Sequence, residues 1–266
     1  GGGNFRGIGL LEPFWKVVEV LMDKRLAHIE FHDCLHGFLS GRGTGTATTE
    51  VKLTQQLAYL DQVTLYGVFI DLKKAYNAMD RDRCMEILVG YGVGPKMQRL
   101  IQLFWDNAEL VCRANGVFGK PFKASRGVPQ GGPVSPRIFN VMVDAIVREW
   151  FRQIMGDEVA CSGIGEQIRA FLAIFYADNG LIQSRDPVLL QSSFNILVEL
   201  FERVGLHTNT KKTVAMVCVP GKIRTPLLRE VYDNCRQGLH TLAEWKRCRV
   251  QCKHCGAHLS AASIPT

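Results

Sequence analysis

Residues 65–71 of the chain read Leu-Tyr-Gly-Val-Phe-Ile-Asp, a short apolar run that ends in a carboxylate. Its aromatic and β-branched side chains favour a buried strand. Residues 168–183 hold two further apolar runs on either side of an Ala-Asp-Asn turn, a pattern typical of a hairpin. Strands of this composition pair in one sheet, so the sequence predicts that Asp71 and Asp178 lie at the same end of that sheet.

Around these strands, apolar residues recur at helical spacing, and turn residues mark the ends of the helices. The predicted helices are residues 11–24, 48–61, 80–90, 95–105, 138–155 and 186–201. A hairpin around Asn115-Gly116 and a last strand are predicted at residues 111–123 and 213–219. This order of elements is typical of an α+β fold, with an antiparallel sheet and helices packed on one face.

The composition excludes a disordered chain and a membrane span. Apolar residues make up 47% of the 266 residues, which is enough for a sizeable core. The longest apolar stretch, residues 171–177, is far shorter than the about 20 residues that cross a bilayer, and residues 1–10 lack the form of a signal peptide. We therefore expect a soluble intracellular protein with no membrane partner, and the sequence leaves nucleus and cytoplasm open.

The net charge of +7 is concentrated near the end of the chain. Residues 221–266 hold eight Lys and Arg residues against three acidic residues, whereas the rest of the chain is nearly balanced. A polyanionic partner such as nucleic acid is therefore favoured for this basic tail. The charge of the main body says little about its partner.

Two carboxylates at one end of a sheet need a cation to neutralise them. Hard oxygen ligands with few His or Cys residues nearby select Mg²⁺ or Mn²⁺. Two such ions can clamp the attacking and leaving oxygens of an in-line phosphoryl displacement. The plainer alternative is that Asp71 caps a turn and that Asp178 belongs to an ordinary tight hairpin, and either residue taken alone favours that alternative.

The neighbours of both carboxylates carry the motifs of a known family. The matching blocks are Arg6-Gly7-Ile8, residues 36–42 (HGFLSGR), residues 69–76 (FIDLKKAY), residues 126–136 with Phe139-Asn140 (RGVPQGGPVSP, FN), residues 176–179 (YADN) and residues 205–213 (GLHTNTKKT). Six blocks in this order resemble a reverse transcriptase, an RNA-directed DNA polymerase, of the group II intron and non-long-terminal-repeat retroelement type.

The resemblance implies a right-hand polymerase, a nucleotidyltransferase that copies RNA or DNA template-primers from deoxynucleoside triphosphates. It implies fingers in residues 1–60 and a palm in residues 61–220, with an inserted fingers segment at about 84–125. Residues 221–266 would then be a basic tail. Because no thumb is evident beyond Pro220, we expect a fingers-palm fragment.

The resemblance also assigns catalytic roles. Asp71 and Asp178 would be the metal ligands, and the main-chain carbonyl of Ile70 or Leu72 would be available to a second ion. Lys212 matches a lysine near the nucleotide and is a candidate proton donor to the pyrophosphate, with a surface lysine as the alternative. Asn209, in the same block, could equally be a turn residue.

Nucleotide binding is assigned in the same way. Tyr76 matches the steric gate, an aromatic ring under the sugar that excludes a 2′-hydroxyl group, and plain packing is its alternative. Gln130 and Gly131 would lie under the templating base pair, unless this loop is an ordinary Pro/Gly turn. The candidate ligands of the triphosphate are Arg42 and, with a weaker match, Arg6 and Lys16, each of which could instead be a solvated surface residue.

Asn179 departs from the family signature, which has a second aspartate at this position. An amide keeps one oxygen acceptor but loses a negative charge, so we expect the site to hold divalent cations less tightly and activity to be weak. The sequence leaves two other functions open. One is a catalytically inactive nucleic-acid-binding remnant, and the other is an RNA-synthesising polymerase on the same palm.

The tail contains one half of a zinc-finger pattern, Cys252 and Cys255 followed by glycine. Cys248 and His258 could complete four zinc ligands, although the connecting loops would be very tight. Free thiols in a truncated finger are the alternative.

Overall fold

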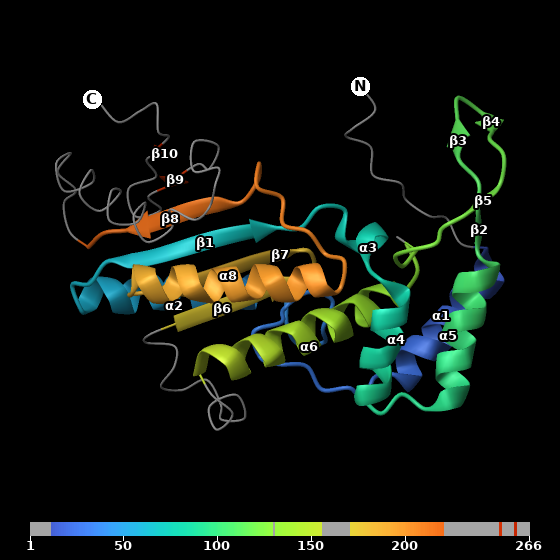
Figure 1. Cartoon of the computed structure of the whole chain (residues 1–266), viewed down its shortest axis with the longest axis horizontal. Helices are drawn as coiled ribbons and strands as arrows, with labels where there is room; N and C mark the ends of the chain where they lie inside the picture. Colours follow the sequence, from blue (N-terminus) through green and yellow to red (C-terminus); the bar gives the residue numbers. More distant parts are fainter. Residues whose placement is uncertain (1–11, 130, 156–170, 221–249, 252–257, 260–266) are drawn as a thin grey trace. The chain divides into compact units, whose positions relative to one another are not determined.

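The computed structural model describes residues 12–129, 131–155, 171–220, 250–251 and 258–259 (Figure 1). Contacts divide the chain into two compact units, which are described separately. The helical unit comprises Gly1–Phe31, Lys74–Ala145 and Val204–Leu206, and the sheet unit comprises His32–Lys73, Ile146–Arg203 and His207–Thr266. The expected division into fingers, palm and tail stays a prediction.

The sheet unit is built on a sheet of six strands in the order β10-β9-β8-β1-β7-β6. The bounds are Leu65–Asp71 for β1, Phe171–Tyr176 for β6, Asn179–Ser184 for β7, Val214–Cys218 for β8, Val250–Gln251 for β9 and His258–Leu259 for β10. The central strand β1 is antiparallel to both β7 and β8, and β6 is antiparallel to β7. The predicted antiparallel sheet, with β1 beside the hairpin of β6 and β7, is confirmed.

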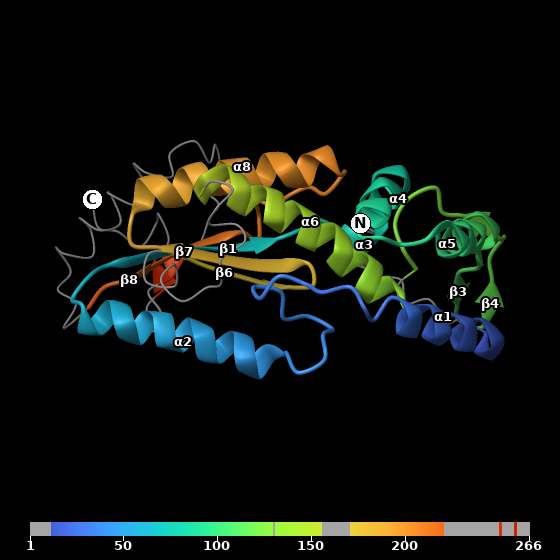
Figure 2. The ribbon, with the colours of Figure 1, turned by 90° about the horizontal axis from the view of Figure 1, so that it is seen from below.

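Helices cover this sheet on two faces (Figure 2). Helix α2 (Thr44–Leu60) lies on one face, and α8 (Pro187–Arg203) lies on the other with the last part of α6 (Ser135–Met155). Strand residues alternate between the faces, and β1 is buried along nearly its whole length, so both faces need cover. The α+β class is confirmed, and α2 adds a layer to the single helical face expected from the sequence.

Each helical layer has its own apolar contacts with the sheet. On the α2 face, Ala58 packs with Leu65 and Met216 in one buried cluster. On the opposite face, the ring of Phe175 meets that of Phe201 edge-on at a centroid distance of 6.4 Å. These contacts bury the sheet between two helical layers.

Helix α2 begins earlier than the sequence predicted. The hydroxyl of Thr46 donates to the carbonyl of Gly43 over 2.8 Å, and the backbone N–H of Gly43 donates to the same hydroxyl over 2.9 Å. This reciprocal cap satisfies polar groups at the helix start. The first turn is therefore helical although it contains Gly45 and two threonines.

The helical unit holds the remaining described helices and a two-part hairpin. The bounds are Pro13–Arg25 for α1, Ala75–Ala78 for α3, Arg81–Gly90 for α4, Pro95–Asn107 for α5, Glu109–Leu110 for β2, Arg113–Ala114 for β3, Val117–Phe118 for β4 and Phe122–Lys123 for β5. Strand β3 pairs with β4, and β2 pairs with β5. The predicted turn at Asn115-Gly116 is confirmed, because both residues have the positive φ that a tight hairpin turn requires.

Helix α1 is tied to the segment that begins α6. The carboxylate of Glu19, which is fully buried, accepts a hydrogen bond from the backbone N–H of Val134 over 3.2 Å. One turn further along α1, Asp23 forms an ion pair with Arg137. Burial raises the pKa of the Glu19 carboxyl, and the hydrogen bond from Val134 partly opposes that shift.

Among the helices of the described residues, none is long and apolar enough to cross a membrane.

Candidate active site

Asp71 and Asp178 lie at the same end of the sheet, as the sequence predicts. Asp71 is the last residue of β1 and pairs with Asn179, the first residue of β7. The backbone N–H of Leu72 donates to the carbonyl of Asp178 over 3.2 Å. Backbone hydrogen bonds therefore hold two acidic residues from distant parts of the chain at the same end of the sheet, one at the end of β1 and the other just before β7.

Asp178 is carried by a tight turn between β6 and β7. Because Tyr176 pairs with Asn179, the turn consists of Ala177 and Asp178 alone. Ala177 has a φ of +53°, a conformation that glycine adopts easily and alanine adopts only with strain. Such a conformation persists only where the surroundings hold it, so the segments packed against this turn matter for the position of Asp178.

An edge segment, residues 34–37, supports the turn. The backbone N–H of Phe175 donates to the carbonyl of Cys34 over 2.7 Å, and the N–H of His36 donates to the carbonyl of Phe175 over 2.8 Å. Gly37 then lies so close to the turn that an ideal Cβ on it would be 2.6 Å from the backbone nitrogen of Ala177. The edge segment extends the sheet beyond β6 and packs directly against the residue with strained backbone.

Arg42 holds the chain around this edge segment in place. One guanidinium nitrogen donates to the carbonyls of His32 and Leu35 over 2.8 and 3.1 Å, and the other forms an ion pair with Asp33 at 2.6 Å. Both terminal guanidinium nitrogens of Arg42 therefore bind partners within the chain. Its predicted contact with a triphosphate stays a prediction.

His36 connects the edge segment to α2. Its Nδ1 atom lies 3.0 Å from the hydroxyl of Thr46, and its Nε2 atom lies 3.4 Å from the carboxylate of Glu50. Burial lowers the pKa of His36, the charge of Glu50 opposes that shift, and the charge of Arg42 adds to it. Near neutral pH, the imidazole is therefore favoured in its neutral form.

Asn209 binds the first carboxylate directly. Its side-chain amide donates to Oδ2 of Asp71 over 2.8 Å, and its backbone N–H donates to the carbonyl of Asp71 over 2.7 Å. The carbonyl of Asn209 also accepts from the backbone N–H groups of Lys212 and Thr213, so Asn209 is a turn residue as well. The sequence placed Asn209 in the same block as Lys212 and left a turn residue as an equal alternative, but it did not indicate the contact with Asp71.

Lys212 approaches the other oxygen of the same carboxylate. Its Nζ atom lies 3.9 Å from Oδ1 of Asp71. The side chain of Lys212 is 62% exposed and that of Asp71 is 17% exposed, so the ammonium group reaches the carboxylate from the solvent side. The sheet unit thus brings Asp71, Asp178 and Lys212 together, and their catalytic roles stay predictions.

Asn179 is exposed beside Asp178, with its amide nitrogen 3.4 Å from a carboxylate oxygen of that residue. An amide therefore stands next to both acidic positions, since Asn179 also pairs with Asp71 across the strands. The local negative charge is that of two carboxylates.

The donor set at this end of the sheet fits a hard divalent cation. Carboxylate oxygens are the ligands that Mg²⁺ takes, usually one or two of them with water and substrate phosphates. Within the described part of the chain, no three or more His, Cys, Asp or Glu side chains gather into a group that could hold a metal. Asp71 and Asp178 are thus the candidate side-chain ligands, and the carbonyls of Ile70 and Leu72 stay predicted additions.

In the helical unit, Tyr76 lies on the short helix α3 and is half-buried. Its ring stacks on that of Phe139 from α6, with the centroids 4.5 Å apart and the planes at 17°. Phe139 is fully buried, so the core of this unit fixes the orientation of the Tyr76 ring.

Two of the other predicted nucleotide-binding residues, Lys16 and Gly131, lie among the described residues of the helical unit. Gly131 is exposed and has a φ of +122°, which favours glycine. Lys16 is exposed on α1. Arg6 and Gln130 lie outside the described residues.

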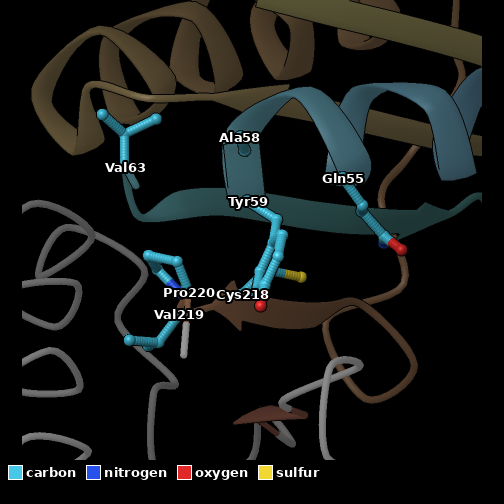
Figure 3. Close-up of a pocket in the computed structure, with 7 residues that line it drawn as sticks. All are labelled: Gln55, Ala58, Tyr59, Val63, Cys218, Val219 and Pro220. Atoms are coloured by element: carbon cyan, nitrogen blue, oxygen red, sulfur yellow. The ribbon is translucent and has the colours of Figure 1, made fainter. Parts of the chain in front are cut away.

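A small pocket lies in the sheet unit, at the other end of β1 (Figure 3). Ala58 and Val63 line it together with Cys218, which pairs with Leu65 at the start of the strand. Because Asp71 ends the same strand, this pocket is separate from the carboxylates.

The predicted zinc ligands belong to the tail of the chain. Cys248, Cys252 and Cys255 lie outside the described residues, and of His258 only the backbone in β10 is described. Zinc binding by the tail stays a prediction.

Comparison with known proteins identifies relatives for this arrangement. The model of the family described as "Reverse transcriptase (RNA-dependent DNA polymerase)" matches residues 1–252. The "Retrovirus-related Pol polyprotein from type-1 retrotransposable element R2" of Popillia japonica is 25% identical over 228 residues, which are 82% of this chain and 31% of that protein. The "Putative 115 kDa protein in type-1 retrotransposable element R1DM" of Drosophila melanogaster is 26% identical over 235 residues, 85% of this chain and 21% of that protein. The chain therefore spans less than a third of the length of each.

Solved structures of similar fold include a telomerase from Candida tropicalis in complex with a fragment of telomeric RNA. The TM-score is 0.56 at 14% identity, over 77% of this chain and 33% of that one. An apo telomerase from the same organism, truncated from its C-terminal domain, gives a TM-score of 0.56 at 15% identity, over 79% of this chain and 40% of that one. At this identity the likeness concerns the fold alone, and it confirms the predicted right-hand polymerase fold.

Proposed function

Because the chain belongs to the reverse transcriptase (RNA-dependent DNA polymerase) family, we propose that it synthesises DNA on a template-primer from deoxynucleoside triphosphates. The relatives from R1 and R2 retrotransposable elements agree with the retroelement type that the motifs predict. The observation that carries the proposal is the position of Asp71, the last residue of β1, beside the turn between β6 and β7 that contains Asp178, at one end of the sheet. This is the placement that a phosphoryl-transfer site with carboxylate ligands needs.

Asp71 and Asp178 would hold two Mg²⁺ or Mn²⁺ ions, with the carbonyl of Ile70 or Leu72 as a further ligand. When bound, such ions neutralise charge on the attacking 3′-oxygen and on the leaving pyrophosphate. Other residues of the chain orient the carboxylate of Asp71. The amide of Asn209 binds Oδ2 of Asp71 over 2.8 Å, and Oδ1 lies 3.9 Å from the ammonium group of Lys212.

Lys212 would hold a proton on its ammonium group and give it to the pyrophosphate oxygen as the bond to the α-phosphate breaks. Its Nζ atom lies 3.9 Å from Asp71, which supports a position near the reacting groups. Its large exposure leaves the side chain free to move toward an incoming triphosphate.

Nucleotide selection would fall to the helical unit. Tyr76 would exclude the 2′-hydroxyl group, and Gln130 and Gly131 would support the templating pair. Stacking of Tyr76 on Phe139 supports the first role, because a steric filter must be held rigidly.

Arg42, Arg6 and Lys16 stay candidate ligands of the triphosphate.

A primer-extension assay tests this function. The chain is incubated with an RNA or DNA template annealed to a DNA primer, deoxynucleoside triphosphates and Mg²⁺ or Mn²⁺. We expect extension by the wild type and none by Asp71→Ala or Asp178→Ala. Glu202→Ala, which removes an exposed carboxylate from α8, is the matched control and should extend normally.

Three outcomes would count against the proposal. Extension by a folded Asp71→Ala variant contradicts the assignment of the carboxylates. A wild type that binds template-primer but extends none contradicts DNA synthesis and favours a binding-only role. A preference for ribonucleotides would favour an RNA-synthesising polymerase.

A further inference from the structure

The segment that carries Tyr76 is joined to a loop that lies about fifty residues away in the sequence. The backbone N–H of Gly127 donates to the carbonyl of Met79 over 2.8 Å, and the N–H of Val128 donates to the carbonyl of Tyr76 over 2.7 Å. These two bonds bind residues 76–79 and 127–128 into one piece of backbone. Any displacement of the loop is thereby passed to Tyr76.

The two backbones are in direct contact at Gly127. This residue has a φ of +76°, and an ideal Cβ on it would lie 2.3 Å from the carbonyl oxygen of Tyr76. Only glycine fits such a close approach at a positive φ. The contact has no side chain on the loop side to hold it, so it depends on the hydrogen bonds around it.

Arg81 supplies a further hydrogen bond at this contact. It is the first residue of α4, and its Nε atom donates to the carbonyl of Gly127 over 2.9 Å. The same guanidinium group lies 5.4 Å from the centre of the Trp105 ring, and one terminal nitrogen lies 3.4 Å from the carbonyl of Trp105. Trp105 is buried in α5. Arg81 therefore fastens the loop to the core of the helical unit.

The chemistry of this contact is specific to arginine. The planar guanidinium group can donate from Nε while its face stacks on an aromatic ring, which an ammonium group cannot reproduce. Burial lowers the pKa of Arg81 and the charge of Asp106 opposes that shift. The guanidinium group stays charged at neutral pH, so its hydrogen bond to a carbonyl is charge-assisted.

We propose that Arg81 is a positioning residue for nucleotide selection, which holds the carbonyl of Gly127 and so fixes the place of Tyr76. Phe139 orients the ring of Tyr76 from one side, and the loop fastened by Arg81 holds its backbone. The proposed role requires no contact between Arg81 and the substrate. This role rests on the proposed function, because it requires that Tyr76 meets the sugar of the incoming nucleotide.

The measured quantity is the ratio of catalytic efficiency, kcat/KM, for a deoxynucleotide to that for the matching ribonucleotide. Small displacements of a positioned group cost up to about a hundredfold in rate, so we expect the ratio to fall by about tenfold in Arg81→Lys and Arg81→Gln. Arg83→Gln is the matched control. Arg83 is exposed two residues along the same helix, and its side chain pairs with Glu86 at 2.8 Å, so its loss should leave the ratio unchanged.

A second measurement, which does not depend on catalysis, tests whether Arg81 holds the loop at Gly127 in place. Amide hydrogen exchange of Gly127 and Val128 should become faster in Arg81→Lys than in the wild type, whereas exchange within α6 should not change. Arg81→Lys keeps the charge and most of the stem, so it is the variant expected to fold. Unchanged exchange of both amides would overturn the proposal even if Arg81→Gln unfolds.

The outcomes separate this inference from the proposed function. If Tyr76→Val lowers the ratio while a folded Arg81→Lys keeps it at the wild-type value, the role of Arg81 is wrong and the proposed function stands. If Tyr76→Val also keeps the ratio, Tyr76 does not meet the sugar, and both assignments are wrong. A wild type that incorporates no nucleotide overturns the proposed function and, with it, the role in selection.

Discussion

The side-chain amide of Asn209 donates a hydrogen bond to Oδ2 of Asp71 over 2.8 Å, while its backbone N–H binds the carbonyl of the same residue over 2.7 Å. One residue thus holds both the side chain and the backbone of the candidate ligand. The remaining oxygen, Oδ1, faces Lys212 at 3.9 Å. The carboxylate is therefore oriented before any cation arrives, and only one of its two oxygens accepts this hydrogen bond from Asn209.

Asn209→Ala should leave the fold intact and weaken catalysis. Loss of a hydrogen bond that orients a metal ligand typically costs about 10- to 100-fold in metal affinity or activity, so we expect a comparable loss of extension rate and a higher Mg²⁺ concentration at half activity. Both are measured by primer extension over a Mg²⁺ titration. Lys211→Ala, an exposed neighbour, is the control. An unchanged Mg²⁺ requirement in Asn209→Ala would show that the orientation is not needed.

Tyr76→Val should raise the incorporation of ribonucleotides relative to deoxynucleotides by about tenfold or more, because a smaller side chain opens space for the 2′-hydroxyl group. Tyr76→Phe is the matched variant. It keeps the ring that stacks on Phe139 at 4.5 Å, so it should discriminate as the wild type does. Competition between the two nucleotides on one template measures the ratio. Equal ratios in the two variants would make Tyr76 a packing residue.

Gly37→Ala should destabilise the turn that carries Asp178. A methyl group there would lie 2.6 Å from the backbone nitrogen of Ala177, and this overpacking costs about 1–3 kcal/mol of unfolding free energy. Urea denaturation measures the loss, and extension should fall with it. Gly45→Ala is the control, since Gly45 lies in α2 with nothing near its Cβ position. A Gly37→Ala protein as stable and active as wild type would contradict the close approach.

His36 should make stability depend on pH in mildly acidic solution. Burial lowers the pKa of His36 in the folded protein, so protons bind the unfolded chain more readily, and unfolding free energy falls as pH drops below about 6.5. The free energy of unfolding is measured from pH 7.5 to 5.5 for wild type and for His36→Asn. The wild type should lose more over this range. His28→Asn, an exposed site, should keep the wild-type slope, and parallel curves for all three proteins would contradict the role of burial.

Local sequence patterns predicted the elements around the site. The apolar run of residues 65–71 and the two runs around Asp178 are long enough and β-rich enough to be recognised as strands. A strand of this apolar composition must pair with other strands in a sheet. The position of Asp71 beside the hairpin therefore followed from the composition of these runs. The Asn-Gly turn of the second hairpin was predicted for a similar reason, since its backbone requires the positive φ that these residues tolerate.

The contacts that shape the site could not be predicted in this way. The bond between Asn209 and Asp71 joins residues 138 positions apart, and nothing in either local pattern points to the other. The turn before β7 proved shorter than expected, because Ala177 adopts a positive φ that its own side chain disfavours. Both features arise from tertiary packing, which overrides local preference at this end of the sheet.

Asn179 offers the sharpest test of how charge limits this site. It is exposed next to Asp178 and pairs with Asp71 across the strands, so a carboxylate at this position would add a third negative charge to the group. Divalent cations are held more tightly as the ligand charge rises. Asn179→Asp should therefore increase the extension rate several-fold and lower the Mg²⁺ concentration at half activity.

The measurement is extension by wild type and Asn179→Asp over titrations of Mg²⁺ and Mn²⁺. Wild type should need more Mg²⁺ than the variant and should gain more from Mn²⁺, because an amide neutralises a cation less well than a carboxylate does. Gln102→Glu, which adds the same charge on α5, is the control for net charge and should behave as wild type. Equal rates and equal Mg²⁺ requirements in wild type and Asn179→Asp would show that the site tolerates an amide here. The two carboxylates of Asp71 and Asp178 would then suffice to hold the ions.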